Sequence, residues 1–448
     1  YGRTLGLTPA RTLAIARHLE VRSVDAFREA ALAGRLREVP GVGSVTEAKI
    51  VANLARDTVA PRGLTVNRAR GLSAEIGAAL GGEVAGAARR YAELSHELAV
   101  VVSSDEPAQV LDRFAELPAI VVVLAREERR ASGLTVDGVP VSVFVTDPEA
   151  YGTELVRATG SAEYVAALGA LPHAASEAEV FERLGIPYCP PELRELPGAG
   201  VPPDLVEVPD IRGELHCHTT WSDGRDTVEG MALAARERGY EYVAICDHSP
   251  NVRVVPGLDA DALLRQADEI AHVNEALAPF RVLRGVECDI RSDGSLDVDD
   301  RVLETLEWVQ LSLHAGQRRS RGELTRMVTE AMRHPAVRAL SHPKGRILNH
   351  RPENALDLEE IFGVALETGV AVEVNGLPDR LDLSAVHVRE ALAAGVPLVL
   401  NSDAHSAAGL RNVELAVATA RKGGAPRSAV LNCLPLVSLL ERAGRRPA

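Results

Sequence analysis

The sequence predicts a multidomain α/β protein, in which a helical region and a small α+β domain precede a large α/β domain. In the second half, seven short apolar runs end in, or just before, an acidic or imidazole side chain. Helical patterns such as 228–238 and 260–276 alternate with these runs, and such alternation favours a parallel sheet or barrel. Polar groups at successive strand ends indicate one active site at one end of that barrel.

The first part of the chain, residues 3–60, has the pattern of helices joined by glycine turns. Two segments, 6–15 and 41–50, each place a glycine-containing turn before an amphipathic helix. Such a turn exposes backbone N–H groups at a helix N-terminus, where anions bind. An ordinary helix cap is the alternative interpretation.

A small α+β domain is expected next, because residues 64–165 alternate helical stretches with β-rich runs at 98–102, 120–124 and 139–145. Residues 176–195 are expected to be helical, and the Pro-rich stretch 197–209 reads as a semi-rigid linker. The predicted domain boundaries are 1–62, 63–195, 196–210 for the linker, and 211–448.

Composition indicates a globular protein with ample core, since 46% of the 448 residues are apolar and 25% are charged. No apolar run approaches the roughly 20 residues that span a bilayer, and we find no signal peptide or lipidation motif. We therefore expect a cytoplasmic protein with no membrane partner.

The chain opens at Tyr1 inside a helical pattern, so a preceding segment is expected. The five scattered cysteines are expected to be reduced, buried thiols.

Charge is unevenly distributed along the chain. The net charge of −14 argues against non-specific nucleic-acid binding by the whole surface. Residues 1–70, however, hold 12 Lys and Arg against 6 Asp and Glu, a net of +6 that leaves −20 for the remainder. A basic front suits contact with phosphates, and an acidic back suits the binding of cations.

Histidines concentrate at the predicted strand ends, since ten of the thirteen lie at or beyond residue 216. Positions i and i+2 of a strand share a face, so His216 and His218 can reach one ion. Imidazole and carboxylate ligands without thiolates suit Zn²⁺, Mn²⁺ or Fe²⁺ more than Ca²⁺. The candidate ligands exceed the needs of one tetrahedral ion, so two or three ions and a bridging carboxylate are implied. These candidates are His216, His218, Asp223, His248, Glu287, His314, His342, Asp403 and His405.

The same half of the chain, residues 211–445, resembles a PHP (polymerase and histidinol phosphatase) domain. The motifs that carry the resemblance are ELHCHTTWSDG at 214–224, CDHS at 246–249, GVECDI at 285–290, LH at 313–314, SHP at 341–343 and NSDAHS at 401–406. The resemblance implies a distorted (β/α)₇ barrel with three divalent metal ions. By motif, it assigns His216, His218, Glu287 and Asp403 to the first ion, the bridging Glu287 with His314 and His342 to the second, and Asp223, His248 and His405 to the third.

The front also resembles a family, the bacterial family X DNA polymerases that carry a PHP domain behind the polymerase core. The resemblance rests on a helix-hairpin-helix motif at 40–43, on the α+β region, and on GIPYCPPELRE at 185–195. It implies contacts between the helix-hairpin-helix and a DNA backbone phosphate. The residues expected to make these contacts are Gly41, Val42, Gly43 and Lys49.

The palm-like region departs from this family where nucleotidyl transfer needs it. The family has an Ala-Gly-Ser…Arg-Arg stretch, an Asp-x-Asp pair and a third Asp. This chain has AGAARR at 85–90, then Glu97, Ala99 and Ser142 at the carboxylate positions. Two-metal transfer needs carboxylates that hold both Mg²⁺ ions, and one Glu cannot do that. A polymerase-inactive palm is predicted, with Asp105 and Asp147 as the nearby carboxylates that would have to compensate.

The function expected from these patterns is that of a metal-dependent phosphoesterase acting on gapped or 3′-ended DNA in repair. The resemblance implies 3′→5′ exonuclease action, with 3′-phosphatase or abasic-site endonuclease action left open, in a nucleoid-associated monomer. The residues expected to act in catalysis are Glu287, Asp403, His314 and Arg346, the last as a phosphate ligand together with Arg318, Arg319 and Lys344. Alternatives are an active polymerase with a proofreading PHP domain, a histidinol-phosphate-type phosphatase, and a non-catalytic DNA-binding scaffold.

Overall fold

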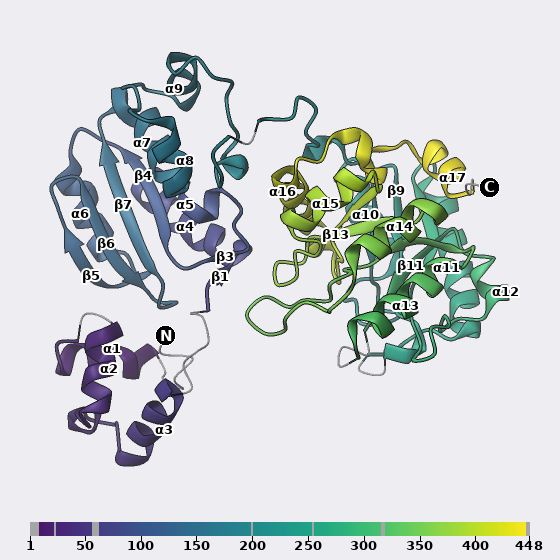
Figure 1. Ribbon diagram of the computed structural model, residues 1–448, viewed down its shortest axis with the longest axis horizontal. Helices are drawn as coiled ribbons and strands as arrows, with labels where there is room; N and C mark the ends of the chain where they lie inside the picture. The colour runs from purple at the N-terminus through teal and green to yellow at the C-terminus, as the bar shows by residue number, and fades with distance from the viewer. Residues whose placement is uncertain are drawn as a thin grey trace. The chain divides into compact units, whose positions relative to one another are not determined.

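The computed structural model describes residues 9–21, 24–55, 62–198, 200–252, 255–314 and 319–444. The chain divides into two compact units, Tyr1–Ala199 and Gly200–Ala448, which run from purple to teal and from teal to yellow in Figure 1. Among the described residues, no helix combines the length and the apolar character needed to cross a membrane.

The first unit begins with a small helical region whose apolar side chains, including Ile15, Leu36 and Ile50, share one core. Gly41 takes a left-handed backbone conformation, with φ at 85°, in the turn before the third helix. The first glycine segment, which starts at residue 6, begins outside the described residues. The helices are α1 (Pro9–His18), α2 (Val24–Leu32), the 3₁₀ turn η1 (Leu36–Glu38) and α3 (Ser44–Ala55).

An α+β domain follows, built on a five-stranded sheet with the order β2-β4-β7-β6-β5. Side chains alternate across β4: Val100 and Val102 pack into the core that α4 and α6 form, whereas Val101 packs with Leu155 of α7. Both faces of β4 are therefore covered. The elements are β1 (Leu64–Thr65), α4 (Val66–Leu80), β2 (Gly82–Ala85), α5 (Gly86–Arg89), β3 (Leu94–Ser95), β4 (Leu98–Ser103), α6 (Pro107–Glu116), β5 (Ile120–Arg126), β6 (Arg130–Thr135), β7 (Pro140–Thr146) and α7 (Tyr151–Thr159).

The helix expected over 176–195 is shorter than predicted. After α8 (Ala162–Leu168), α9 spans Glu177–Arg183, and only a 3₁₀ turn, η3 (Pro191–Leu193), follows before residue 195. Gly185 adopts a φ of 68°, which ends the helix. Pro187 and Pro190 lack the backbone N–H that a continuing helix would need.

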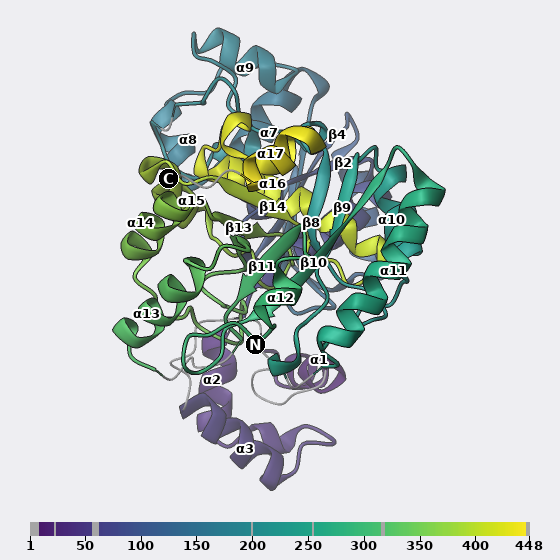
Figure 2. The same cartoon turned by 90° about the vertical axis from the view of Figure 1, so that its right-hand side faces the viewer.

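The second unit is a nearly closed barrel of seven parallel strands in sequential order, from β8 to β14, as Figure 2 shows. A bridge between Cys217 and Ala404 joins the last strand's end to the first strand, and the His218 amide donates to the Ala404 carbonyl at 2.8 Å. The predicted (β/α)₇ barrel is thus confirmed. Its strands are β8 (Gly213–Cys217), β9 (Tyr242–Ile245), β10 (Arg281–Asp289), β11 (Trp308–Ser312), β12 (Val337–Leu340), β13 (Ala371–Asn375) and β14 (Leu398–Asn401).

Helices surround the barrel and cover its outer face (Figure 2). Outward side chains such as Val243 and Val286 pack against these helices. Inward side chains fill the lower barrel, where Tyr242, Leu283 and Trp308 form a separate apolar core. The upper barrel is polar, so the strand ends surround one layer of charged side chains. The helices are α10 (Val228–Glu237), α11 (Ala260–Leu277), α12 (Asp300–Leu303), α13 (Arg321–Met332), α14 (Leu358–Thr368), α15 (Ala385–Ala394), α16 (Val413–Gly423) and α17 (Leu436–Gly444).

Candidate metal centre

Six imidazoles meet at the carboxyl ends of the barrel strands. Neighbouring ring centroids lie 5.2 Å apart for His216 and His218, and 4.5 Å apart for His218 and His248. The series continues through His314, 5.5 Å from His248, to His342, which lies 5.3 Å from His314 and 6.1 Å from His216. Five rings therefore form a closed circle. The sixth, that of His405, stacks on His218 at 4.3 Å.

Glu287 lies in the middle of this circle and is almost fully buried. Its carboxylate comes within 4 Å of five imidazoles, because β10 points the side chain inward between the ends of its neighbours. The contacts to Oε1 are His342 Nε2 at 2.9 Å, His314 Nε2 at 3.5 Å and His216 Nε2 at 3.6 Å, and those to Oε2 are His248 Nδ1 at 2.8 Å and His218 Nε2 at 3.7 Å.

Two further carboxylates border the same cluster. Asp403 Oδ1 lies 3.1 Å from His218 Nε2 and 3.7 Å from His216 Nε2. Asp223 lies on the other side, with Oδ2 at 3.3 Å from His405 Nε2 and Oδ1 at 3.6 Å from His248 Nε2. All nine residues singled out by the sequence thus come together in one place.

The donor set fits divalent metal ions. Several buried ring nitrogens lack a hydrogen-bond partner among the described residues, namely His216 Nε2, His218 Nδ1 and His248 Nδ1. His248 Nδ1 lies 2.8 Å from a Glu287 oxygen, the distance of a charge-assisted contact between the ring and the carboxylate. Ligand atoms on a tetrahedral ion with bonds of about 2.0–2.2 Å lie roughly 3.3–3.6 Å apart, close to the spacing between His216, Glu287 and Asp403.

The structure divides these ligands differently from the motif-based assignment. Three groups could each hold an ion: His218, Asp223, His248 and His405; His216, His218 and Asp403; and His248, Glu287 and His314. His248 and His218 each belong to two groups. His342 lies outside these three groups, although its Nε2 contacts Glu287. The division among individual ions remains a prediction.

Glu373, a residue that the sequence reasoning did not select, orients the cluster from below. It is fully buried on β13. His216 Nδ1 donates to its Oε1 at 2.7 Å, and the backbone amide of His342 donates to its Oε2 at 2.8 Å. This bond keeps the lone pair of His216 on Nε2, the atom that faces Glu287 and Asp403. A signal existed in the sequence, because Glu373 is an inward-facing carboxylate in an otherwise apolar run.

Asp247, a strand-end residue outside the predicted ligand set, supports the loop that carries Asp223. This buried carboxylate accepts hydrogen bonds from the Thr219 amide at 2.8 Å, from the Thr219 hydroxyl at 2.6 Å and from Gln266 Nε2 at 2.6 Å. The Ser222 hydroxyl also donates to it. The loop between β8 and α10 is thereby fixed beside the imidazoles.

Electrostatics keep the carboxylates ionised. Burial alone would raise the pKa of Glu287, but the charges of His314, His248 and His216 together hold that pKa well below its ordinary value. Burial and the neighbouring His248 lower the pKa of His218 to about 4. Metal ions bind an ionised carboxylate and a neutral imidazole. The neighbouring carboxylates outweigh burial and raise the pKa of His216, His248 and His405, so these three rings would release protons when an ion binds.

The cationic residues expected to hold phosphate differ in where they point. Arg346 is buried, and its Nε donates to the Arg380 carbonyl at 2.9 Å. Arg319 is half-exposed and donates to the Ser292 carbonyl at 2.8 Å, and Arg318 lies outside the described residues. Lys344 is buried, 3.8 Å from Glu353. The role of Arg346 as a phosphate ligand stays a prediction.

The palm-like sheet has no carboxylate at Ala99 and Ser142, the two strand positions where the family has aspartates. Ala99 on β4 lies directly opposite Ser142 on the parallel strand β7. Asp105 and Asp147 follow the far ends of these strands, where Ser103 pairs with Thr146. Ser103 lies four residues beyond Ala99, and Thr146 lies four residues beyond Ser142. At about 3.3 Å per residue, the two pairs are roughly 13 Å apart along the strands. Neither aspartate can therefore replace a carboxylate at Ala99 or Ser142.

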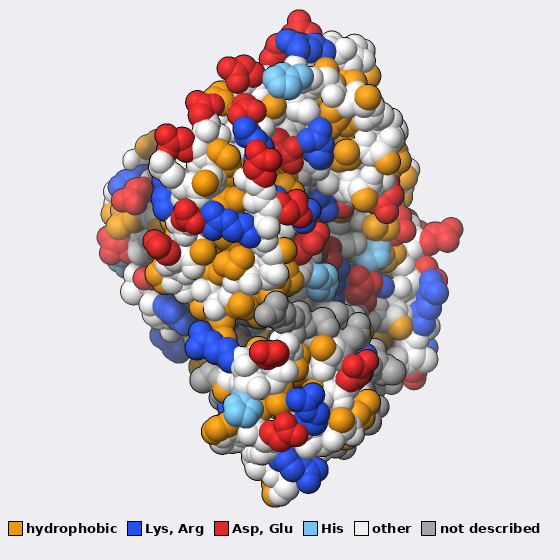
Figure 3. Space-filling view, turned by 90° about the vertical axis from the view of Figure 1, so that its left-hand side faces the viewer, with side chains coloured by type: hydrophobic (Ala, Val, Ile, Leu, Met, Phe, Trp, Pro, Cys, Tyr) orange, Lys and Arg blue, Asp and Glu red, His pale blue; other side chains and the backbone are white. Residues whose placement is uncertain are grey.

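The predicted DNA contacts of the helical region are accessible in part. Gly41, Gly43 and Lys49 are exposed, whereas Val42 is buried in the local core. On the face shown in Figure 3, the described Lys and Arg side chains are interspersed with Asp and Glu. DNA binding by these four residues stays a prediction.

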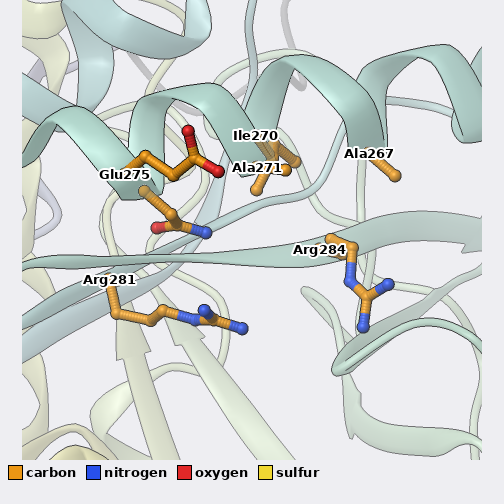
Figure 4. A pocket seen from close by; sticks show the side chains of 7 residues that line it. Ala267, Ile270, Ala271, Glu275, Arg281 and Arg284 are labelled. Atoms are coloured by element: carbon orange, nitrogen blue, oxygen red, sulfur yellow. The ribbon is translucent and has the colours of Figure 1, made fainter. Parts of the chain in front are cut away.

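A separate pocket lies on the outside of the barrel, between α11 and β10 (Figure 4). Its two guanidinium groups belong to Arg281 and Arg284, and both pair with Glu307, at 2.9 Å and 3.4 Å. The Asn274 side chain bonds the backbone of Val282. These polar groups hold the strand to its neighbours, so this pocket adds no chemistry to the metal centre.

Comparison with known proteins agrees with this architecture. The fold and the cluster define a PHP domain, and the family model of that name matches residues 214–375. The DNA polymerase/3′-5′ exonuclease PolX of Bacillus subtilis is 32% identical over 467 residues, which cover 96% of this chain and 82% of that protein. The chain therefore belongs to the PolX family of family X DNA polymerases with a PHP domain.

Relatives of the second unit alone have a different description. A probable phosphatase from Photobacterium profundum is 27% identical over 52% of this chain and 95% of its own length. Another probable phosphatase, from Acetivibrio thermocellus, is 30% identical over 43% of this chain and 78% of its own length. The barrel thus also occurs in proteins that match only this half of the chain.

Proposed function

We propose that the barrel is a metal-dependent phosphoesterase that removes nucleotides from DNA 3′ ends, and that the palm-like domain has lost nucleotidyl transfer. The observation that carries the first part is the position of Glu287, a single buried carboxylate within 4 Å of five imidazoles. The name of the Bacillus relative, which includes a 3′-5′ exonuclease, supports DNA as the substrate.

The residues that would hold the ions are the nine of the cluster, with Glu287 shared between ions. When bound, divalent ions supply Lewis-acid polarisation of a phosphate and make water nucleophilic at neutral pH. Their identity (Zn²⁺, Mn²⁺ or Fe²⁺) and their number, three by resemblance, are part of the proposal.

The protein's own contribution is orientation. His405 Nδ1 donates to the Asp403 carbonyl at 2.9 Å, which keeps the lone pair on Nε2, toward Asp223. Asn375 Nδ2 donates to Asp403 Oδ2 at 2.9 Å and leaves Oδ1 toward the imidazoles. Ring tautomers and carboxylate rotamers are thus fixed in the protein before a substrate arrives, which reduces the reorganisation that catalysis would need.

The loss of polymerase function is supported by what replaces the palm carboxylates. Ala99 packs beside the apolar cluster of Ala85, Val101 and Leu155. Arg89 pairs with Glu177 at 2.7 Å, and Arg90 pairs with Glu195 at 3.2 Å. Arg89 and Arg90, the arginines that would contact a nucleoside triphosphate in a working palm, therefore pair with carboxylates of the same domain.

One assay separates the candidate activities. Purified chain loaded with Mn²⁺ or Zn²⁺ is incubated with a 3′-recessed oligonucleotide, with and without nucleotides, and with histidinol phosphate in parallel. We expect 3′ shortening without extension. Template-dependent extension would contradict the loss of polymerase activity.

Hydrolysis of small phosphomonoesters is the second candidate, because the relatives that match only the barrel are named probable phosphatases. Faster turnover of histidinol phosphate than of the oligonucleotide would favour it. A 3′-phosphorylated oligonucleotide and a duplex with an abasic site distinguish 3′-phosphatase and endonuclease action from exonuclease action.

A further inference from the structure

We propose that Arg380 binds the reacting phosphate beside the metal centre, and that Arg346 positions Arg380 rather than contacting the substrate. This inference rests on the proposed function, since the phosphate is that of a DNA end. It assigns a phosphate-binding role to a residue of the loop that follows β13.

Arg380 borders the cluster directly. Its Nε lies 3.9 Å from Asp403 Oδ2, and its side chain is 17% exposed. The other oxygen of Asp403 faces His218, at 3.1 Å. The guanidinium thus approaches the Asp403 oxygen that does not face His218, next to the centre but outside the set of candidate ligands.

The guanidinium has hydrogen-bonding capacity to spare. Nη1 of Arg380 is buried and has no hydrogen-bond partner among the described residues. A buried N–H group without an acceptor is rare, and such a group beside a functional site points to a missing ligand. Phosphate oxygens suit this group, because a guanidinium can offer them two parallel charge-assisted hydrogen bonds.

Arg346, by contrast, is bound to backbone. Its Nε donates to the Arg380 carbonyl at 2.9 Å, and its Nη2 donates to the Leu381 carbonyl. Nη1 lies 3.6 Å from Glu353 Oε1. Arg346 therefore holds the segment that carries Arg380, which explains why the β12–α14 loop contains a buried cation.

The local charge also favours an anion at Arg380. Burial is the largest cause that lowers the pKa of Arg351, and the charge of nearby Arg380 is the second. Burial raises the pKa of Asp382, a fully buried carboxylate two residues along the chain, to about 6. A bound phosphate would relieve the repulsion between the two guanidinium groups.

The test compares the full-length wild type with Arg380→Ala, Arg380→Lys and a control, Arg389→Ala, which removes an exposed guanidinium on α15. Each protein is loaded with Mn²⁺, and its metal content is measured by mass spectrometry. Binding of inorganic phosphate is measured by calorimetry, and turnover of the 3′-recessed oligonucleotide is measured separately.

We expect Arg380→Ala to keep its metal and to lose about 100-fold in kcat/KM, the usual scale for one preorganised donor. Phosphate affinity should fall at least tenfold, Arg380→Lys should be intermediate, and added guanidinium ion should partly restore phosphate binding to Arg380→Ala. Arg389→Ala should match the wild type.

The inference is overturned if metal-loaded Arg380→Ala binds phosphate as the wild type does, if the wild type binds none, or if Arg380→Ala loses its metal, because Arg380 would then only support Asp403. If the wild type hydrolyses no DNA but binds phosphate through Arg380, the proposed function fails and the phosphate site stands.

Discussion

The palm-like sheet and the barrel both bring neighbouring parallel strands together, but they fill the shared positions with opposite chemistry. At the level of Ala99 and Ser142, the sheet offers a methyl group and a hydroxyl, and Ala99 packs with apolar neighbours. At the level of Glu287, the barrel offers a buried carboxylate ringed by imidazoles. The first arrangement stabilises a fold, and the second gathers buried imidazoles and carboxylates, a donor set that fits divalent cations.

The difference teaches that the cores of the two domains depend on polar residues to different extents. The sheet core of Val100, Phe114 and Val143 does not depend on any carboxylate at the strand ends. The barrel centre is the reverse, because its polar groups contribute no apolar packing and hold one another in place.

The largest expected effect comes from Glu287→Gln, which removes the carboxylate charge from the centre of the cluster. We expect a loss of at least about 10³-fold in oligonucleotide hydrolysis and a lower metal content by mass spectrometry. Glu304→Gln, at an exposed position of the same unit, is the matched control. Full activity in Glu287→Gln would show that hydrolysis does not depend on the cluster in the barrel.

A second prediction tests the palm-like domain as a purely structural body. Arg194 is fully buried and pairs with Glu177, which also binds Arg89 at 2.7 Å. Glu177→Ala leaves Arg194 buried without its carboxylate, so we expect the free energy of unfolding to fall by about 3–5 kcal/mol. Hydrogen exchange of α7 to α9 measures it, with Glu182→Ala as the exposed control. An unchanged exchange rate would refute this account.

This pair also has a pH dependence. Burial would raise the pKa of Glu177, but the hydrogen bonds from Arg89 and Arg194 outweigh burial and lower it. A lowered pKa means that the contribution is complete above the unfolded value of about 4.3 and is lost as pH falls below it. Glu177→Ala should therefore cost less at acidic pH.

A third prediction concerns the support beneath the metal centre. Glu373→Gln keeps the size of the side chain but weakens its hold on His216 Nδ1. We expect metal affinity to fall by about 10–100-fold, as measured by competition with a chelator. Glu367→Gln, exposed on α14, is the control. Unchanged affinity would show that His216 needs no carboxylate partner.

The smallest effect is expected at the helical region. Lys49→Ala should weaken duplex binding about fivefold at most and reduce the slope of log affinity against log salt by about 1. Fluorescence anisotropy at several salt concentrations measures both. A slope equal to that of the wild type would remove Lys49 from the DNA contacts.

Much of the barrel could be predicted because its pattern repeats. Each strand of the second unit is a short apolar run, and the polar residue at its end marks where the run stops. His216 and His218 share a face by strand periodicity alone. The helix predicted over 176–195 is too long, because the apolar pattern continues past Gly185. The left-handed backbone of Gly185 ends the helix.

Other features needed the fold. Ala99 and Ser142 are far apart in sequence, and only the register of β4 and β7 shows that they lie opposite each other and that Asp105 and Asp147 lie beyond the far ends of these strands. Arg346 is predicted to bind phosphate because it follows a strand end, and its contacts with two backbone carbonyls could be seen only in the fold.

The sequence by itself indicated alternating strands and helices and the nine candidate ligands at the strand ends, because local periodicity marks where each apolar run stops, and the resemblance to a PHP domain implied the (β/α)₇ barrel. Only the tertiary structure decided that Glu287 contacts five imidazoles, that Glu373 fixes His216, and that Arg380 borders Asp403 with a donor that has no partner among the described residues. The physical reason is that hydrogen bonds and charge contacts between residues distant in the chain depend on distances that closure of the barrel sets.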